Sequence, residues 1–270
     1  MKSPVIIRSI DPQRSQGLGL GLGRGRGRSL AVAGIIKDWI IKHGLSPGDR
    51  LPQEHQLIAD LAVSKGTVRE ALKVLETQGL IRTRTGPGGG AFITEVREDH
   101  ASALLANYLL FRDVSIADIY ELRISLEPQL VADLAPRITT EQVEELRTRM
   151  SSYTAPPATI EEEREQRRAE LEFHETLAGF SDNPLLGFVC GFLARLLKEL
   201  TICKRIYDQP NPELRERGVS YQEQLIEALC ARDAETARAV MQAHMRAAQR
   251  MMLAQEAQLT KGFLSTSERQ

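Results

Sequence analysis

The sequence predicts a mainly α-helical protein, in which a small N-terminal winged helix-turn-helix unit (α+β) precedes an all-α antiparallel helical bundle. Three observations carry this prediction. Two short segments between residues 54 and 78 place apolar residues at helical spacing on either side of a tight turn. A hairpin pattern with a glycine-rich tip follows at residues 80–94. Beyond Thr94 the apolar residues keep a helical spacing, and no alternating strand pattern is found.

The N-terminal unit is expected to begin with a helix over residues 30–43. The apolar face of this helix contains Ile35, Ile36, Trp39 and Ile40. Residues 1–29, which include the run GLGLGLGRGRG, are expected to form a flexible Gly/Arg-rich arm. The GxG spacings are not preceded by a strand or followed by a βαβ unit, which argues against a dinucleotide loop. The arm is interpreted as a solvated tail, or alternatively as a segment whose arginines touch DNA.

The helix-turn-helix prediction rests on two apolar runs and on the residues that punctuate them. The first run is Leu57, Ile58, Leu61 and Val63, and the second is Val68, Ala71, Leu72 and Leu75. Ser64 is a favourable N-cap for the second helix, and Gly79 stands at the position where a helix commonly ends. Residues 80–84 and 91–94 then predict two strands around the turn at residues 86–90.

The second of these helices is predicted to read DNA. Its first residues are short or basic and point away from the apolar stripe, as in helices whose N-termini reach base edges. Glycines at the hairpin tip would let the backbone approach a phosphate or the minor groove. The predicted DNA-binding residues are His55, Ser64, Lys65, Gly66, Thr67, Arg69, Arg82, Arg84, Gly86 and Gly88. A surface helix followed by an ordinary hairpin is the simpler alternative, but the ordered combination of basic helix start, strand arginines and glycine tip favours DNA.

The same residues resemble a known family. The segment LSPGDRLPQEHQLIADLAVSKGTVREALKVLETQGLI is similar to the N-terminal domain of the GntR family of bacterial transcription regulators, above all in PGDRLP and VREAL. The later helices resemble the FadR subfamily with the ligand-binding domain called FCD. The runs that carry this second likeness are ELRISLEP, EFH followed by SDNP, and a late helix that contains His244. The two likenesses together cover roughly residues 30–255.

The C-terminal part is predicted to be a bundle of antiparallel helices with ligand space in its core. We expect helices over residues 99–112, 115–136, 139–152, 161–180, 184–207, 212–231 and 233–256. The implied organisation is an arm over residues 1–29, a winged helix-turn-helix domain over 30–95, an FCD-like effector-binding and dimerisation domain over 99–256, and a C-terminal tail over 257–270, frayed from Lys261. Residues 95–99 are expected to form a short charged link.

The resemblance to FCD domains implies a metal site. In that family an acidic residue and three histidines converge on a divalent ion, and the matching positions are Glu170, His174, Gln222 and His244. Zinc is the expected ion because imidazole suits late first-row metals. Glu170 replaces an aspartate and Gln222 replaces a histidine, which should weaken the affinity. Hydrogen-bonded core histidines are the alternative interpretation.

Arg123 is the predicted effector-binding residue. It lies on an otherwise apolar helix, and a buried arginine needs an anionic partner. In the resemblance this arginine faces the effector pocket, where it would clamp a small carboxylate. A protein carboxylate such as Glu127 is the alternative partner.

Composition limits the partners. Residues 1–100 contain 15 Lys and Arg against 10 Asp and Glu, whereas the remainder contains 20 against 26. This asymmetry indicates DNA contact through the first part only. The three cysteines are far apart and are expected to be reduced, buried thiols of a cytoplasmic protein, with a redox sensor as the alternative. No apolar run is long enough to span a membrane, and no signal peptide is expected.

These observations favour a ligand-responsive, dimeric transcription regulator, most simply a repressor, that binds a palindromic operator. A metal-dependent hydrolase is the second class, because Glu, His and a metal ion can activate water. The chain has no G-x-S-x-G, no HExxH and no nucleophile paired to a base, so we expect no enzyme. An architectural DNA-binding protein, whose bundle only dimerises, is the third class.

Overall fold

The computed structural model describes residues 24–109, 111–200, 203, 205–206 and 211–267. The chain divides into two compact units, Met1–Leu104 and Leu105–Gln270, and each is described by itself. The division falls within helix α4 (Glu98–Leu109).

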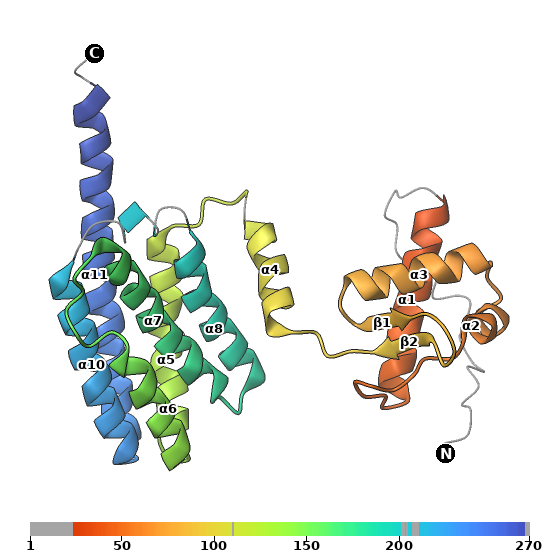
Figure 1. Ribbon diagram of the computed structural model, residues 1–270, viewed down its shortest axis with the longest axis horizontal. Helices are drawn as coiled ribbons and strands as arrows, with labels where there is room; N and C mark the ends of the chain where they lie inside the picture. Colours follow the sequence, from red (N-terminus) through yellow and green to blue (C-terminus); the bar gives the residue numbers. More distant parts are fainter. Residues whose placement is uncertain (1–23, 110, 201–202, 204, 207–210, 268–270) are drawn as a thin grey trace. The chain divides into compact units, whose positions relative to one another are not determined.

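The first unit contains three helices and a two-stranded sheet, as the sequence predicts (Figure 1). These elements are α1 (Arg24–Lys42), α2 (Glu54–Leu61), α3 (Lys65–Thr77), β1 (Ile81–Arg84) and β2 (Gly90–Ile93). Helix α3 contacts α1, α2 and β1, so its apolar face forms the centre of the unit. Val68 and Leu75 of α3 are fully buried against Ile36 of α1 and Leu57 of α2 in one apolar cluster. The winged helix-turn-helix prediction is confirmed.

The two strands form an antiparallel hairpin whose register follows from the chain's alternation. Ile81 pairs with Ile93 and Arg84 with Gly90, so that one face of β1 is buried at Ile81 while Arg82 and Arg84 are exposed. The residues before α2 extend this sheet locally: Leu51 N donates to Ala91 O at 2.9 Å, and Arg50 forms a single bridge with Phe92. The base of the wing is therefore tied to the segment that leads into α2.

The second unit is the predicted helical bundle. Its helices are α5 (Ile116–Leu134), α6 (Thr140–Ser151), α7 (Ile160–Gly179), α8 (Pro184–Glu199), α10 (Pro212–Cys230) and α11 (Ala234–Ser267). Helix α5 packs against α8 and α11, α7 against α6 and α8, and α10 against α6 and α11 (Figure 1). The helices begin where short polar side chains accept hydrogen bonds from their first turns, as Thr139 does from Gln142 N at 3.2 Å.

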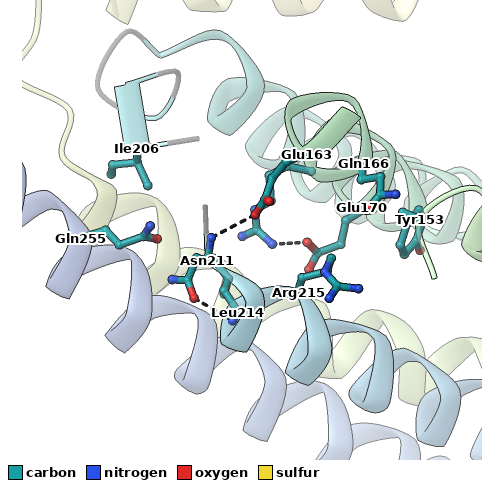
Figure 2. Close-up of a pocket in the computed structure, with 10 residues that line it drawn as sticks. Tyr153, Glu163, Gln166, Glu170, Ile206, Asn211, Leu214, Arg215 and Gln255 are labelled. Carbon is teal, nitrogen blue, oxygen red and sulfur yellow. Dashed lines mark hydrogen bonds and ion pairs between the residues drawn. The ribbon is translucent and has the colours of Figure 1, made fainter. Parts of the chain in front are cut away.

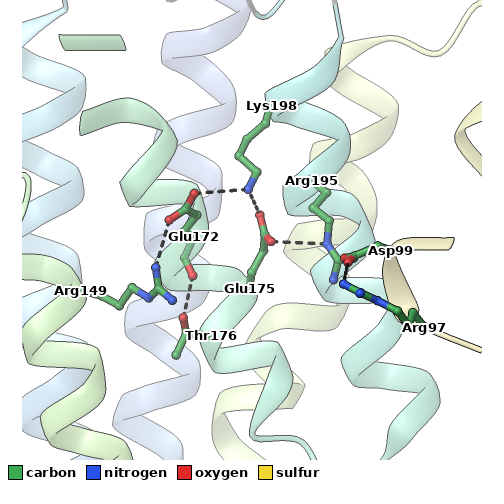
Figure 3. Close-up of polar contacts among 8 residues, drawn as sticks. All are labelled: Arg97, Asp99, Arg149, Glu172, Glu175, Thr176, Arg195 and Lys198. Atoms are coloured by element: carbon green, nitrogen blue, oxygen red, sulfur yellow. Dashed lines mark hydrogen bonds and ion pairs between the residues drawn. The ribbon is translucent and has the colours of Figure 1, made fainter. Parts of the chain in front are cut away.

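Helix α7 carries two of the candidate polar residues, Glu170 and His174, and its outer side forms ion pairs with its neighbours (Figure 3). Glu172 lies 3.0 Å from Arg149 of α6 and 3.8 Å from Lys198 of α8. Glu175 lies 2.5 Å from Lys198 and 3.4 Å from Arg195, both on α8. The opposite face of α7 is buried and presents Glu170 and His174 to the core.

Several predicted boundaries differ from the structure. Helix α1 begins at Arg24 rather than at residue 30, so residues 24–29 belong to a helix and only residues 1–23 of the predicted arm lie outside the described residues. Helix α8 ends at Glu199 rather than at 207. Helix α11 continues to Ser267, past the predicted end at 256 and through the tail expected to fray from Lys261. No proline interrupts this tail, and most of its residues up to Lys261 are good helix formers, so nothing local ends the helix.

The cysteines follow the prediction at two of three positions. Cys190 and Cys203 are buried and are not part of a disulfide, and burial raises the pKa of Cys190 to about 12, which keeps it protonated. Cys230, by contrast, is exposed, because it ends α10 at the surface of the bundle. Among the described helices none is both long enough and apolar enough to cross a membrane.

Candidate functional site

The turn between α2 and α3 positions the first candidate surface. Ala62 adopts a left-handed conformation with φ of 50°, which reverses the chain after α2. Ser64 then caps α3: its Oγ accepts from Thr67 N at 3.2 Å and lies 2.9 Å from Thr67 Oγ1. The predicted N-cap is thus present. The start of α3 is held in a defined conformation with Lys65 and Gly66 exposed at its first turn.

Helix α3 separates its buried face from a charged one. Lys65, Arg69 and Lys73 follow each other at intervals of four residues, which places them in one row along the exposed side. Arg69 Nε lies 3.1 Å from Glu54 at the start of α2, and 58% of the Arg69 side chain is exposed. An exposed pair of this kind contributes only about 0–1 kcal/mol, so it orients the guanidinium without locking it. His55, the next residue of α2, is exposed as well.

The wing presents a second set of cations. Arg82 and Arg84 are exposed on β1, and the Arg84 guanidinium lies 4.9 Å from the centre of the Phe92 ring. At the tip, Gly86 and Gly88 have φ of 90° and 78°, which only glycine adopts without strain. The predicted tip residues are therefore the ones that the turn geometry requires.

Arg50 is a wing residue to which the sequence analysis assigned no role. Its Nη2 donates to Gly89 O at the tip, and its guanidinium lies 5.8 Å from the centre of the Phe92 ring. A Cβ placed on Gly90 would lie 2.8 Å from Arg50 Nε, so Gly90 leaves room for this side chain. Arg50 and Gly89 are 39 residues apart in sequence, and no local pattern signals such a contact.

The helical unit contains the second candidate site, a group of buried polar residues in an apolar core. The predicted metal and effector residues are all at most 6% exposed: Arg123, Glu170, His174, Gln222 and His244. Glu127, which is 3% exposed, lies among them. They come from α5, α7, α10 and α11. Burying so many polar groups is costly unless each is paired, and the pairing decides what the site can do.

Glu127 is the centre of one paired group. Its carboxylate forms an ion pair with Arg123 Nε one turn away on α5 and accepts from His174 Nδ1 of α7 at 2.7 Å. Burial alone would raise the pKa of Glu127, but the charges of Arg123 and His174 and their hydrogen bonds outweigh it and lower this pKa to about 2. The structure therefore gives Arg123 the protein carboxylate that the sequence left as the alternative to an effector.

The two histidines continue this group. His174 Nε2 lies 3.3 Å from His244 Nε2, and the two rings are nearly parallel, with an interplanar angle of 14°. Burial, with the charges of His174 and Arg123, lowers the pKa of His244 well below its usual range, so this ring is neutral at pH 7. Because the carboxylate of Glu127 can only accept, His174 carries a proton on Nδ1.

The other two predicted metal ligands, Glu170 and Gln222, contact other side chains of the protein. Glu170 forms an ion pair with Arg167, three residues earlier on α7, and both side chains are at most 10% exposed. Gln222 Oε1 accepts from Tyr153 OH at 2.8 Å. Within the part of the chain that the structure describes, no three His, Cys, Asp or Glu side chains are arranged to hold a metal ion. Of the predicted metal residues Glu170, His174, Gln222 and His244, the two imidazoles contact each other, whereas Glu170 and Gln222 contact Arg167 and Tyr153.

A pocket opens beside Glu170 (Figure 2). Its cavity volume is about 30 Å³. Its polar lining combines the guanidinium groups of Arg167 and Arg215 with amides and carboxylates from α7, α10 and α11, namely Glu163, Gln166, Glu170, Asn211 and Gln255. Arg123 does not line this pocket, because it is directed to Glu127 in the core.

Comparison with known proteins agrees with both units. Residues 28–93 match the family described as bacterial regulatory proteins, gntR family, and residues 118–247 match the FCD domain. The chain belongs to the GntR family of bacterial regulatory proteins. The FCD architecture of this GntR protein fits the FadR-like subfamily, as the sequence analysis expected. The chain is a transcription regulator and not an enzyme, so the hydrolase alternative falls away.

Individual GntR relatives cover most of the chain. The HTH-type transcriptional regulator LutR of Bacillus subtilis is 28% identical over 76% of this chain and 93% of its own length. The HTH-type transcriptional repressor NanR of Salmonella newport is 28% identical over 78% of this chain and 79% of its own. The structure of Streptococcus agalactiae GntR covers 83% of this chain and 99% of its own, with a TM-score of 0.59 at 23% identity, which supports the fold.

Proposed function

We propose that this GntR-family regulator binds a palindromic operator as a homodimer, represses transcription, and releases or tightens DNA in response to a small carboxylate bound in the helical unit. The observation that carries the proposal is the exposed row of Lys65 and Arg69 at the start of a capped α3, flanked by the arginines of the wing. The printed name of the NanR relative, a transcriptional repressor, supports the direction of control. Its place of action would be the cytoplasm, where the operator DNA lies.

The proposed DNA contacts divide by type. Lys65, Gly66, Thr67 and Arg69 would enter the major groove at the N-terminus of α3, where base edges are read. His55, Arg82, Arg84 and the tip glycines Gly86 and Gly88 would contact the backbone on either side. Ser64 fixes the start of the reading helix through Thr67. Backbone contacts position the protein, whereas the α3 contacts specify the sequence.

A homodimer follows from the small footprint of one helix-turn-helix. Two copies related by a two-fold axis would place two α3 helices about one DNA turn apart, roughly 34 Å. Light scattering at micromolar concentration, with and without a DNA fragment from upstream of the gene, tests this directly. We expect twice the chain mass without DNA and that mass plus one DNA fragment with it, and one chain in both conditions would contradict the proposal.

The proposed effector site is the pocket beside Glu170. Arg215 lines it with 16% of its side chain exposed, and it forms an ion pair with the exposed Glu216, 3.4 Å away. A guanidinium in this position can receive a carboxylate through two parallel hydrogen bonds. The pocket amides of Gln166, Asn211 and Gln255 would meet hydroxyl groups or a second acid. Arg123, the predicted clamp, instead positions Glu127 and His174.

Calorimetry with a panel of small mono- and dicarboxylic acids and sugar acids tests the effector. The acid that binds should also change operator affinity, because a ligand shifts an equilibrium only through its different affinity for the two states. Arg215→Ala should abolish this binding, whereas Arg217→Ala, which removes an exposed arginine of the same helix, should not. If no acid alters operator affinity, the architectural alternative replaces this part of the proposal.

Zinc has no part in this proposed function. The fit of the family's metal to this chain depends on four donors that meet, and here Glu170 and Gln222 are directed to Arg167 and Tyr153. Two imidazoles alone fall short of the three or four protein ligands that zinc sites use.

A further inference from the structure

We infer that the polar core of the helical unit does not bind a metal ion, because the Arg167 guanidinium supplies the positive charge that a bound cation would otherwise bring to Glu170. This inference concerns the chemistry of the core alone, so it stands or falls independently of DNA binding and of the effector. It rests on three separate pairings among the residues that match the family's metal ligands.

The first pairing fixes Glu170. Arg167 and Glu170 lie one turn apart on α7 with side chains 10% and 8% exposed, so the carboxylate charge is neutralised within the protein. The head of Glu170 also rests against α10 at a glycine: a Cβ placed on Gly218 would lie 2.6 Å from Glu170 Oε1. The missing side chain at Gly218 provides the space in which Glu170 meets Arg167, and both of these residues line the pocket. To reach the histidines, Glu170 would have to abandon a buried guanidinium, which is costly.

The second pairing occupies the side-chain oxygen of Gln222, which would otherwise be available as a metal ligand. Gln222, 1% exposed, accepts a hydrogen bond from Tyr153 OH at 2.8 Å. Burial and the nearby charge of Glu170 raise the pKa of Tyr153, so this phenol remains protonated and remains a donor. An amide oxygen is already a weaker zinc ligand than imidazole nitrogen, and here it has a partner.

The third pairing satisfies the imidazoles. His174 Nδ1 donates to Glu127, which Arg123 neutralises on its other side, and His174 Nε2 lies 3.3 Å from His244 Nε2. Every charge in this sequence of contacts has an opposite charge or a hydrogen-bond partner from the protein. The protein partners of the four family positions are thus Arg167 for Glu170, Tyr153 for the Gln222 oxygen and Glu127 for the imidazole pair, in place of one shared cation.

Metal uptake by the tag-free, full-length protein tests this inference. The wild type, dialysed against a zinc buffer, should show no stoichiometric zinc by elemental analysis and no uptake by calorimetry. The double variant Arg167→Met/Gln222→His frees Glu170 and restores an imidazole, and it should gain one zinc per chain. This gain should be lost when His174→Ala or His244→Ala is added. The matched control, Arg168→Met/Gln222→His, removes the adjacent exposed arginine instead and should gain none.

Each result decides the matter. A wild type that carries one divalent ion per chain, lost on His174→Ala, overturns the inference, and this measurement needs no variant that could misfold on the way to it. A folded double variant, checked by circular dichroism, that binds no more zinc than the wild type overturns the role given to Arg167 and Gln222. Uptake by the Arg168 control equal to that of the double variant would also remove Arg167 from the explanation.

Discussion

The surface of the first unit that is proposed to read DNA, here called the reading surface, carries the exposed cations Lys65, Arg69, Arg82 and Arg84. Its arginines differ in burial and pairing from the arginine in the polar core of the second unit. Arg69 on α3 is 58% exposed and has only a weak surface partner, Glu54. Arg123 on α5 is 1% exposed and forms an ion pair with Glu127, itself 4% exposed. Arginine at the surface keeps its hydration and can exchange one partner for another, whereas a buried arginine must keep the partner it has.

This difference indicates where each unit meets its ligand. The exposed cations around α3 and the wing can release counterions and receive DNA phosphates without breaking a costly contact. The buried charges of the bundle stabilise the arrangement of α5, α7 and α11, and the proposed effector site is instead the pocket that Arg215 lines. Mutations in the two regions should therefore differ in what they change: binding in the first, stability in the second.

The largest effect is expected at Glu127. Glu127→Ala leaves Arg123 buried without its carboxylate and removes the acceptor of His174, which should lower the free energy of unfolding by about 3–5 kcal/mol. Glu172→Ala is the matched control, because it removes a carboxylate of α7 that is 41% exposed, and it should cost less than about 1 kcal/mol. Urea denaturation followed by circular dichroism measures both, and equal losses would contradict the contrast between buried and exposed charges.

The same carboxylate predicts a pH dependence. The folded-state pKa of Glu127 is lowered to about 2, below its unfolded value near 4.5. Its contribution is therefore fully present above the unfolded pKa and is lost as the pH falls toward 2. The difference in unfolding free energy between wild type and Glu127→Ala should be constant between about pH 5 and 7. It should shrink as the pH falls from about 4.5 toward 2. A difference that stays unchanged down to pH 3 would contradict the assignment.

The next effect is expected at Arg69. Arg69→Ala should weaken binding to the specific operator by roughly 1–3 kcal/mol, the range for a bidentate base contact, and should leave binding to unrelated DNA less affected. Arg217→Ala, which removes an arginine of similar exposure from the helical unit, is the control and should bind as the wild type does. Gel-shift titrations with both DNAs measure the difference, and unchanged specific binding by Arg69→Ala would remove this residue from the reading surface.

A smaller effect is expected at the helix caps. Ser64→Ala removes the acceptor for Thr67 N and should destabilise the first unit by about 1 kcal/mol, with a parallel loss of operator affinity. Thr139→Ala removes an equivalent cap from α6 in the helical unit, and it should cost similar stability with no direct loss of DNA contact. Thermal unfolding and anisotropy titrations separate the two, and equal losses of affinity would show that the Ser64 effect is not local.

The sequence predicts those features whose causes are local. Ser64 caps α3 as expected because a serine three residues before a backbone donor needs no distant partner. The glycines at 86 and 88 mark the wing tip because only glycine takes these backbone angles easily. The helical bundle is predicted because its apolar spacing is sustained over long segments. Such patterns fix the elements and the face that each of them buries.

The partners of the buried charges lie beyond this kind of prediction. Glu170 and His174 share a face of α7, but Arg167 lies on that face too, and spacing alone does not decide which neighbour the carboxylate meets. The choice depends on the space left at Gly218 of α10. Arg50 and Gly89 meet in the same way through tertiary structure. Sequence spacing therefore identified the polar residues of the core but not their pairing.

The most direct test of the central claim, that DNA is bound through the exposed cations of the first unit alone, is the salt dependence of operator binding. Anisotropy titrations over a series of salt concentrations give the slope of log K against log salt for the wild type, Arg84→Ala and Arg217→Ala. We expect Arg84→Ala to reduce the slope by about one, because one phosphate contact is lost, and Arg217→Ala to leave it unchanged. An unchanged slope for Arg84→Ala together with a reduced slope for Arg217→Ala would contradict the claim.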